Sequence, residues 1–250
     1  MILKKYNIFL MWIFFFVILL IIFLIYKPKP HIFHHSRINT VYNYDSPPKP
    51  NFLKYPLYYL AKPLVFEIHE GDVLYIPYGW WHWVFSRDEN IAINQWFTKK
   101  INDKPFVFKN NRKIDLTNFF EKVNGEGMGI ASNNPNIQSF VRQKVYPIDK
   151  DEIKFMGTLK EFKTISKHKK YSGFVIENQL PEEFINGVPE QVQDNSDYNL
   201  WYYSNNANSG LHYDNYDNFL CQVKGSKKIY LFPPSYSKWL YGDKILQFND

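Results

Sequence analysis

The hydrophobic pattern of the chain changes sharply after residue 26. Residues 7–26 form an uninterrupted apolar run without a charged side chain. As an α-helix this run would measure roughly 30 Å, the thickness of the hydrocarbon core of a bilayer. A cleaved secretory signal is the less favoured alternative, because the run is long and no small-residue cleavage site follows it. The pattern predicts a single-pass anchor over residues 1–26, with the lipid bilayer as partner. Lysines flank both ends, so its orientation stays open.

Residues 27–50 are polar and rich in proline, which is typical of a tether between an anchor and a folded domain. His31, His34 and His35 lie in this segment. We interpret them as solvated linker residues, because no further ligand for a metal ion lies nearby in the sequence.

Beyond the tether, residues 51–250 alternate short apolar runs with turn-forming residues, the pattern of a β-rich domain. Polar turns at 69–72 and 87–90 separate the first runs. We expect strands over residues 64–68, 73–76, 81–86 and 91–97.

The second half of the domain continues this pattern after two helical segments. Apolar positions at helical spacing predict a helix over 115–123, and a capping box predicts a second one starting at Thr158. A turn at 224–226 is expected to join the last two strands as a hairpin. Those later strands are expected over residues 174–176, 200–203, 219–223 and 227–232. Together these elements predict a mainly β antiparallel barrel or jelly roll with a helical insert.

Composition narrows the functional classes. A single cysteine, Cys221, excludes a disulfide framework and a cysteine-rich zinc site. The net charge of +6 and the lysine-rich segment 150–170 raise the possibility of nucleic-acid binding. Acidic residues are interspersed there and the helix has an apolar face, so we favour a solvated helix surface.

Two short segments carry the residue types of a metal site. His212 and Asp214 are two positions apart, which places both on one face if the segment is a strand. His82 follows an Ile-Pro and Gly-Trp-Trp corner at the expected start of a strand. Two histidines and one carboxylate make the facial triad of non-haem Fe(II) oxygenases, which leaves positions for a 2-oxo acid and O2.

The motifs around these ligands resemble the core of JmjC-type, cupin-fold Fe(II)/2-oxoglutarate oxygenases. The nearest resemblance is to the group of the asparaginyl hydroxylase that inhibits hypoxia-inducible factor. The resemblance implies a double-stranded β-helix fold and the cofactors Fe(II) and 2-oxoglutarate. The matching elements are the His212/Asp214 pair, then Asn218, Gln222, Gly225 and Lys227, the Leu-Phe-Pro-Pro at 231–234, the segment 71–82, and Asn94 with Trp96.

The resemblance also implies roles for residues near the metal. Lys227 would pair with the far carboxylate of 2-oxoglutarate, and Ser209 would donate a second hydrogen bond to it. Asn94 and Asn218 would contact the ligands, and Trp96 would form a wall of the pocket or part of the core. Asp217 is not expected to bind the metal, because its offset of three from Asp214 would place it on the opposite strand face.

The order of the motifs departs from the family, because the segment with His82 precedes the one with His212. We interpret the domain as circularly permuted: residues 51–98 form the C-terminal half of the family core, 105–200 the helical N-terminal region, and 201–250 the His-x-Asp half. Closure within one chain is favoured over pairing of half-domains between two chains. Permutation is tolerable because domain termini often lie close together.

Two functions follow from the sequence. The first is a membrane-anchored Fe(II)- and 2-oxoglutarate-dependent dioxygenase that hydroxylates a protein side chain, with removal of an N-methyl group as a variant. The second is a membrane-tethered cupin-fold binding module without catalysis, in case the permutation misplaces His82. The oligomeric state stays open.

Overall fold

The computed structural model describes residues 56–110, 114–133, 153–181, 184, 197–209 and 211–240. The predicted anchor at 7–26 and the tether at 27–50 lie outside these residues. Within the described ranges, no helix is long and apolar enough to cross a membrane.

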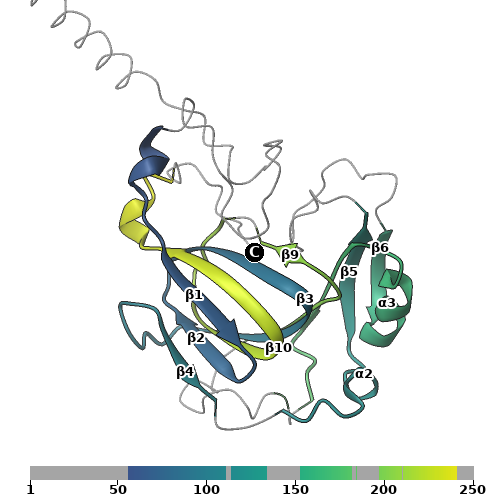
Figure 1. Cartoon of the computed structure of the whole chain (residues 1–250). Helices are drawn as coiled ribbons and strands as arrows, with labels where there is room; N and C mark the ends of the chain where they lie inside the picture. The colour runs from purple at the N-terminus through teal and green to yellow at the C-terminus, as the bar shows by residue number, and fades with distance from the viewer. Residues whose placement is uncertain are drawn as a thin grey trace, which may run out of the picture.

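Most of the described chain forms one antiparallel sheet that curves into a barrel (Figure 1). Its strand order is β4-β2-β10-β3-β8-β7-β5-β6, with β1 also paired to β10 and β9 to β3. The strands are β1 (Leu64–His69), β2 (Asp72–Ile76), β3 (Trp81–Phe97), β4 (Phe106–Lys109), β5 (Glu126–Ser132), β6 (Ile153–Thr158), β7 (Tyr171–Glu177), β8 (Asp197–Tyr203), β9 (Ala207–Asn208) and β10 (Asp217–Phe232). This mainly β antiparallel architecture agrees with the predicted jelly roll.

Two long strands, β3 and β10, form the centre of the sheet. They pair antiparallel from Asp217 opposite Phe97 to Phe232 opposite Trp81. The expected turn at 87–90 and the expected hairpin at 224–226 are therefore wrong, since both segments lie inside continuous strands.

The polar residues in these segments mark β-bulges rather than chain reversals. The β3–β10 register shifts between Gln222 and Ser226, and Gly225 adopts φ 78° at the bulge. The Gln222 amide donates to the Lys224 carbonyl over 2.6 Å, and the Asn90 amide donates to the Ser226 carbonyl over 2.8 Å. These bonds satisfy backbone groups that the shifted ladder leaves unpaired, so both strands bend without ending.

Because of the bend, the edge of β10 that does not face β3 pairs with two different strands. Residues 218–221 pair with β2, and residues 226–231 pair with β1. Alternate side chains then line two sides of the sheet. Ala92, Leu220 and Ile229 belong to one buried cluster, whereas Ile93 and Phe219 belong to another that the helices help to cover.

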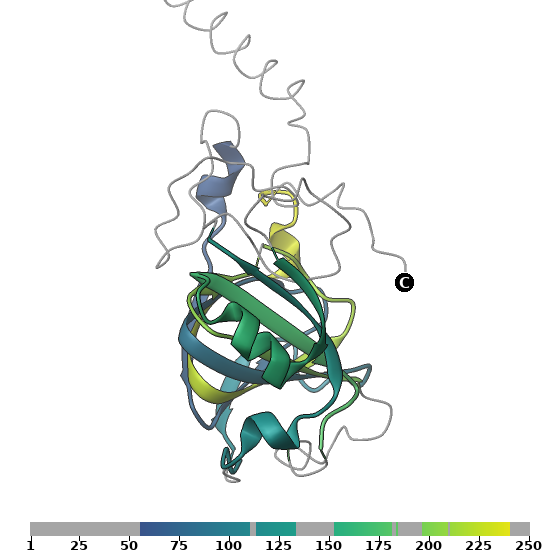
Figure 2. The same cartoon turned by 90° about the vertical axis from the view of Figure 1, so that its right-hand side faces the viewer.

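The helices are fewer and shorter than the sequence suggested. The helix expected over 115–123 is limited to α2 (Phe119–Lys122), because Asn118 adopts a left-handed conformation at its start. The capping box at Thr158 is confirmed and begins α3 (Leu159–Ser166). Both helices lie on the outside of the curved sheet (Figure 2). The region 105–200, expected to be helical, contributes β4 to β7 and most of β8 to this sheet.

The two ends of the described domain lie beside each other. A short 3-10 helix, η1 (Pro56–Leu60), begins it, and another, η3 (Pro234–Tyr236), lies near its end. Leu240 and Ala61 are buried in one cluster, against which Leu57 packs (Figure 1).

Candidate metal centre

The structure brings together two histidines and one aspartate from distant parts of the chain. His82 is the second residue of β3 and forms an isolated antiparallel bridge with His212. The His82 N–H donates to the His212 carbonyl over 2.7 Å, and the His212 N–H donates back over 3.1 Å. Ligand atoms of His82, His212 and Asp214 all lie within 4.8 Å of one another. One chain thus supplies the complete set.

Asp214 is held by contacts from two other segments. The expectation that the His212–Asp214 segment is a strand is wrong, because only His212 makes a β-bridge and Asp214 lies in a loop. The Gly79 N–H donates to the Asp214 carbonyl over 3.0 Å. The Trp96 indole N–H donates to Asp214 Oδ2 over 3.1 Å, so Trp96 positions the carboxylate directly.

Burial keeps His82 in the neutral form that a metal ligand needs. Its side chain is almost inaccessible, and its Nδ1 lies 2.9 Å from the Trp80 carbonyl. Desolvation and, after it, the neighbouring His212 lower the pKa of His82. An Nδ1–H that donates to the Trp80 carbonyl leaves the Nε2 lone pair on the side of Asp214, with Nε2 and Asp214 Oδ2 3.7 Å apart.

Lys227 is a buried cation in the middle of β10, not at the start of a strand as expected. Its Nζ donates to the Ser86 hydroxyl over 2.5 Å and lies 4.8 Å from the Tyr203 ring centroid. Within the described residues no carboxylate forms an ion pair with it, and burial lowers its pKa to about 7. A buried ammonium without a carboxylate partner is costly unless an anion completes its surroundings.

Two buried asparagines lie against each other, and the side-chain amide of one of them has no partner among the described residues. The Asn94 amide donates to Asn218 Oδ1 over 3.0 Å. The Asn218 Nδ2 is buried and has no hydrogen-bond partner among the described residues. A buried donor left without an acceptor is uncommon in folded proteins, and it is consistent with a ligand site.

Ser209 and Asp217 have structural contacts. The Ser209 hydroxyl accepts the Val84 N–H over 2.9 Å, which fixes it beside β3 between the positions of His82 and Ser86. Asp217 accepts from the Tyr75 hydroxyl over 2.5 Å and from the Tyr78 N–H over 3.2 Å. Asp217 is not in the candidate ligand group. The strand-spacing argument does not apply, because residues 213–216 are not in a strand, and its carboxylate instead binds Tyr75.

Ser86 and Tyr203 are site residues that sequence reasoning missed. Ser86 shares strand parity with His82, so alternation along β3 was a signal that could have found it. Tyr203 ends β8, and no local pattern connects it with Lys227.

The residues present fit a divalent metal and an anionic ligand. Two imidazoles and a carboxylate with open positions are the donor set of non-haem Fe(II). Lys227, with Ser86 beside it, is suited to a carboxylate, and the unpaired Asn218 amide supplies a donor for an oxygen atom.

Comparison with known proteins identifies a family for this chain. A sequence model of the cupin-like domain matches residues 22–104 and 104–247. A putative JmjC domain-containing protein of Acanthamoeba polyphaga mimivirus is 29% identical over 236 residues, which cover 75% of this chain and 36% of the relative.

Two other relatives match over shorter stretches. The tRNA wybutosine-synthesizing protein 5 of Gallus gallus is 35% identical over 72 residues (28% of this chain, 22% of the relative). A lysine-specific demethylase of Arabidopsis thaliana is 50% identical over 46 residues (18% and 8%). The chain therefore spans about a third or less of the length of these relatives. No solved structure matches it.

Proposed function

This chain belongs to the cupin-like domain family, and we propose that it is an Fe(II)- and 2-oxoglutarate-dependent dioxygenase. The observation that carries the proposal is the convergence of His82, His212 and Asp214 within 4.8 Å, together with a buried lysine that has no carboxylate partner among the described residues. The JmjC-type relative supports it. The finer resemblance to the asparaginyl hydroxylase group stays a prediction.

The protein side chains divide the work between holding the metal and orienting the co-substrate. His82, His212 and Asp214 would hold Fe(II), which with 2-oxoglutarate and O2 supplies the oxidising chemistry for a C–H bond. Lys227 would bind the far carboxylate of 2-oxoglutarate, with the Ser86 hydroxyl beside it.

The remaining polar groups would position these ligands. The Trp96 indole restricts the Asp214 carboxylate to one orientation by donating to Oδ2. The Asn218 amide would complete its hydrogen bonding on a ligand oxygen, since it has no partner among the described residues.

Turnover of 2-oxoglutarate tests the proposal. The full chain with Fe(II), ascorbate and candidate peptides should convert 2-oxoglutarate to succinate, and Asp214→Ala should abolish this conversion. Asp197→Ala is the matched control, because Asp197 is an exposed carboxylate at the start of β8. Absence of succinate from a folded, metal-loaded wild type would refute the proposal.

We propose a protein or peptide side chain as the substrate, with hydroxylation favoured and N-methyl removal as the variant. The lysine-specific demethylase among the relatives supports a protein substrate, whereas the tRNA wybutosine-synthesizing protein supports a nucleic acid. Mass spectrometry separates the two protein reactions: hydroxylation adds an oxygen atom, and demethylation releases formaldehyde.

A non-catalytic binding module is the second candidate, motivated by the unusual motif order. Titration calorimetry with Mn(II) separates the two functions. One site per chain with micromolar affinity would support the enzyme, and absence of binding would support the module. One site per two chains would support a centre shared between chains.

We also propose that residues 7–26 anchor the protein in a membrane. The supporting observation is the length and uniformity of the apolar run. The full chain should stay in the membrane pellet after alkaline carbonate extraction, and a variant without residues 1–26 should not. Extraction of the full chain would refute the anchor.

We further propose that the domain is circularly permuted. Two features support this: the family model matches two consecutive segments, and Leu240 packs in the same cluster as Ala61. A chain re-ordered to place 105–240 before 56–104 should fold and bind Mn(II) as the wild type does. Failure of this chain to fold would count against permutation.

A further inference from the structure

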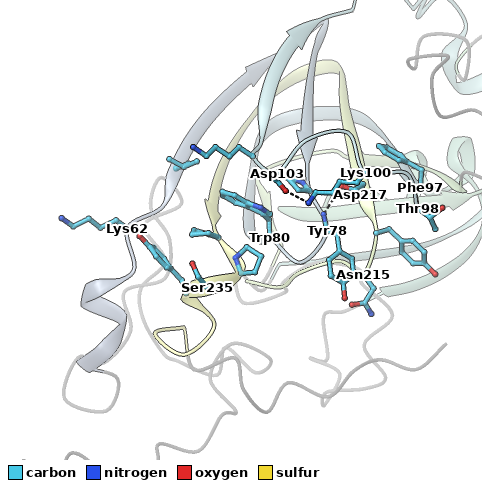
Figure 3. A pocket seen from close by; sticks show the side chains of 17 residues that line it. Lys62, Tyr78, Trp80, Phe97, Thr98, Lys100, Asp103, Asn215, Asp217 and Ser235 are labelled. Atoms are coloured by element: carbon cyan, nitrogen blue, oxygen red, sulfur yellow. Dashed lines mark hydrogen bonds and ion pairs between the residues drawn. The ribbon is translucent and has the colours of Figure 1, made fainter.

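A groove of about 930 Å³ lies at the end of the barrel (Figure 3). Residues at or next to both ends of β3 and both ends of β10 line it. Residues at the start of β1 and after the end of β2 complete the lining. Seventeen residues from five chain segments line it, and aromatic, proline and lysine side chains dominate this lining.

The groove is next to the candidate metal centre but separate from it. Its lining includes Asn215 and Tyr216, which directly follow Asp214, and Trp80, two residues before His82. Neither the three candidate ligands nor Lys227 lines it. A molecule in the groove would thus lie against the loop that carries Asp214 and against the loop that leads into β3, where His82 lies.

The walls present rigid apolar rings to solvent. Tyr78 is 59% exposed and Tyr216 is 45% exposed, although both are large aromatic residues. Trp80 is buried and forms part of the groove lining, and Pro77 and Pro233 add further rigid apolar surface. Aromatic grooves with proline neighbours are suited to extended polypeptide, especially proline-containing segments in the polyproline conformation.

The charges of the groove favour an acidic partner. Three lysines and two aspartates line it, but Lys100 pairs with Asp103, and Asp217 is buried with its carboxylate bound to Tyr75. Lys62 and Lys104 are exposed and form no ion pair among the described residues. Their charges are therefore available to a ligand.

The groove wall is held in place before any ligand arrives. Asp217 accepts from the Tyr78 N–H, and the Tyr75 hydroxyl that binds Asp217 also accepts the N–H groups of Ile101 and Asn102 over 3.2 Å. One buried carboxylate therefore connects β10, the loop before β3 and the segment after it. Such pre-organisation reduces the entropy cost of binding.

We propose that this groove docks an extended, acidic, proline-containing segment of the substrate polypeptide. The inference rests on the proposed function only in naming this segment as part of a substrate. Single-stranded nucleic acid, which also stacks on aromatic rings, is less well matched, because only Lys62 and Lys104 offer charge without an ion pair among the described residues, whereas a groove for a nucleic acid follows the backbone with many cations.

Equilibrium binding tests the docking site without requiring turnover. The probes are fluorescein-labelled peptides of six Glu-Pro, Gln-Pro or Lys-Pro repeats and a fluorescein-labelled oligothymidine, titrated with the full chain. The Glu-Pro peptide should bind about tenfold more tightly than the Gln-Pro peptide, with an advantage that falls as salt increases. Equal binding of the three peptides, or tighter binding of the oligothymidine, would overturn the proposal.

Charge reversal locates the site on the molecule. The double variant Lys62→Glu/Lys104→Glu should weaken Glu-Pro binding about tenfold, because each reversal exchanges an attraction for a repulsion. Tyr78→Ala should weaken all three peptides, since it removes an exposed ring. The matched control is Lys154→Glu. Lys154 is an exposed lysine on β6, the last strand in the sheet order, and β6 contributes no residue to the groove. If the control weakens binding as much as the double variant, the groove is not the site.

The two assays distinguish failure of the docking site from failure of the proposed function. Peptide binding that persists without 2-oxoglutarate turnover supports the docking site and removes the enzyme. Turnover of 2-oxoglutarate without peptide binding removes the docking site and keeps the enzyme.

Discussion

Replacement of Lys227 by methionine separates the stability cost of a buried lysine from its use in binding. The folded protein lowers the pKa of Lys227 from 10.5 to about 7. At about 1.4 kcal/mol for each pKa unit, this difference corresponds to about 5 kcal/mol, of which about 4 kcal/mol is expressed at pH 7. Loss of the hydrogen bond to Ser86 offsets about 1 kcal/mol of the gain. Without ligand, Lys227→Met should therefore raise the free energy of unfolding at pH 7 by about 3 kcal/mol.

The pH dependence of this difference has a defined sign. Between pH 7 and pH 10 the unfolded chain holds a proton on Lys227 that the folded chain has released. The stability of the wild type should therefore rise with pH relative to Lys227→Met, and the difference should shrink. Urea unfolding followed by tryptophan fluorescence at pH 7 and pH 9 measures it. Lys228→Met, which removes the adjacent and more exposed lysine, should show no comparable gain.

Ligand binding should cancel most of this difference in stability. In the presence of Mn(II), 2-oxoglutarate at about a hundred times the dissociation constant of 2-oxoglutarate should raise the free energy of unfolding of the wild type by about 3 kcal/mol. Lys227→Met should gain much less from 2-oxoglutarate, because it lacks the cation for the far carboxylate. The reasoning is refuted if Lys227→Met is less stable than the wild type without ligand, or if 2-oxoglutarate stabilises both equally.

Three further predictions concern residues of β10. Asp217→Asn should weaken Mn(II) binding measured by calorimetry, because it loosens the Tyr78 loop whose Gly79 N–H holds Asp214; unchanged affinity would show that this loop does not position the ligand. Gly225→Ala should lower the free energy of unfolding by about 2 kcal/mol in urea titrations, since φ is 78° and the added Cβ would lie 2.7 Å from a backbone oxygen. Cys221, whose pKa burial raises to about 12, should react with a thiol reagent only after unfolding; rapid reaction in the native state would contradict its burial.

Local pattern predicted most strands because alternation and turn residues act over a few positions. The runs at 64–68 and 73–76 match β1 and β2 within one residue, and Gly71 lies in the turn between them with φ 83°. Pattern failed at 87–90 and 224–226, where polar residues and a glycine indicated turns. Whether such a segment reverses the chain or bulges depends on the opposing strand, which no local window contains.

The sequence by itself determined the elements and the chemical character of the candidate site: two histidines, an aspartate, a lysine and asparagines in recognisable motifs. Only the tertiary structure decided that His82 and His212, which lie 130 positions apart, exchange backbone hydrogen bonds between β3 and the segment that precedes β10. It also decided that Lys227 is buried without a carboxylate partner among the described residues, whereas Lys228 beside it is more exposed. The physical reason is that residue type defines the donors a side chain can offer, while its pKa and its partners depend on burial and on distant strands.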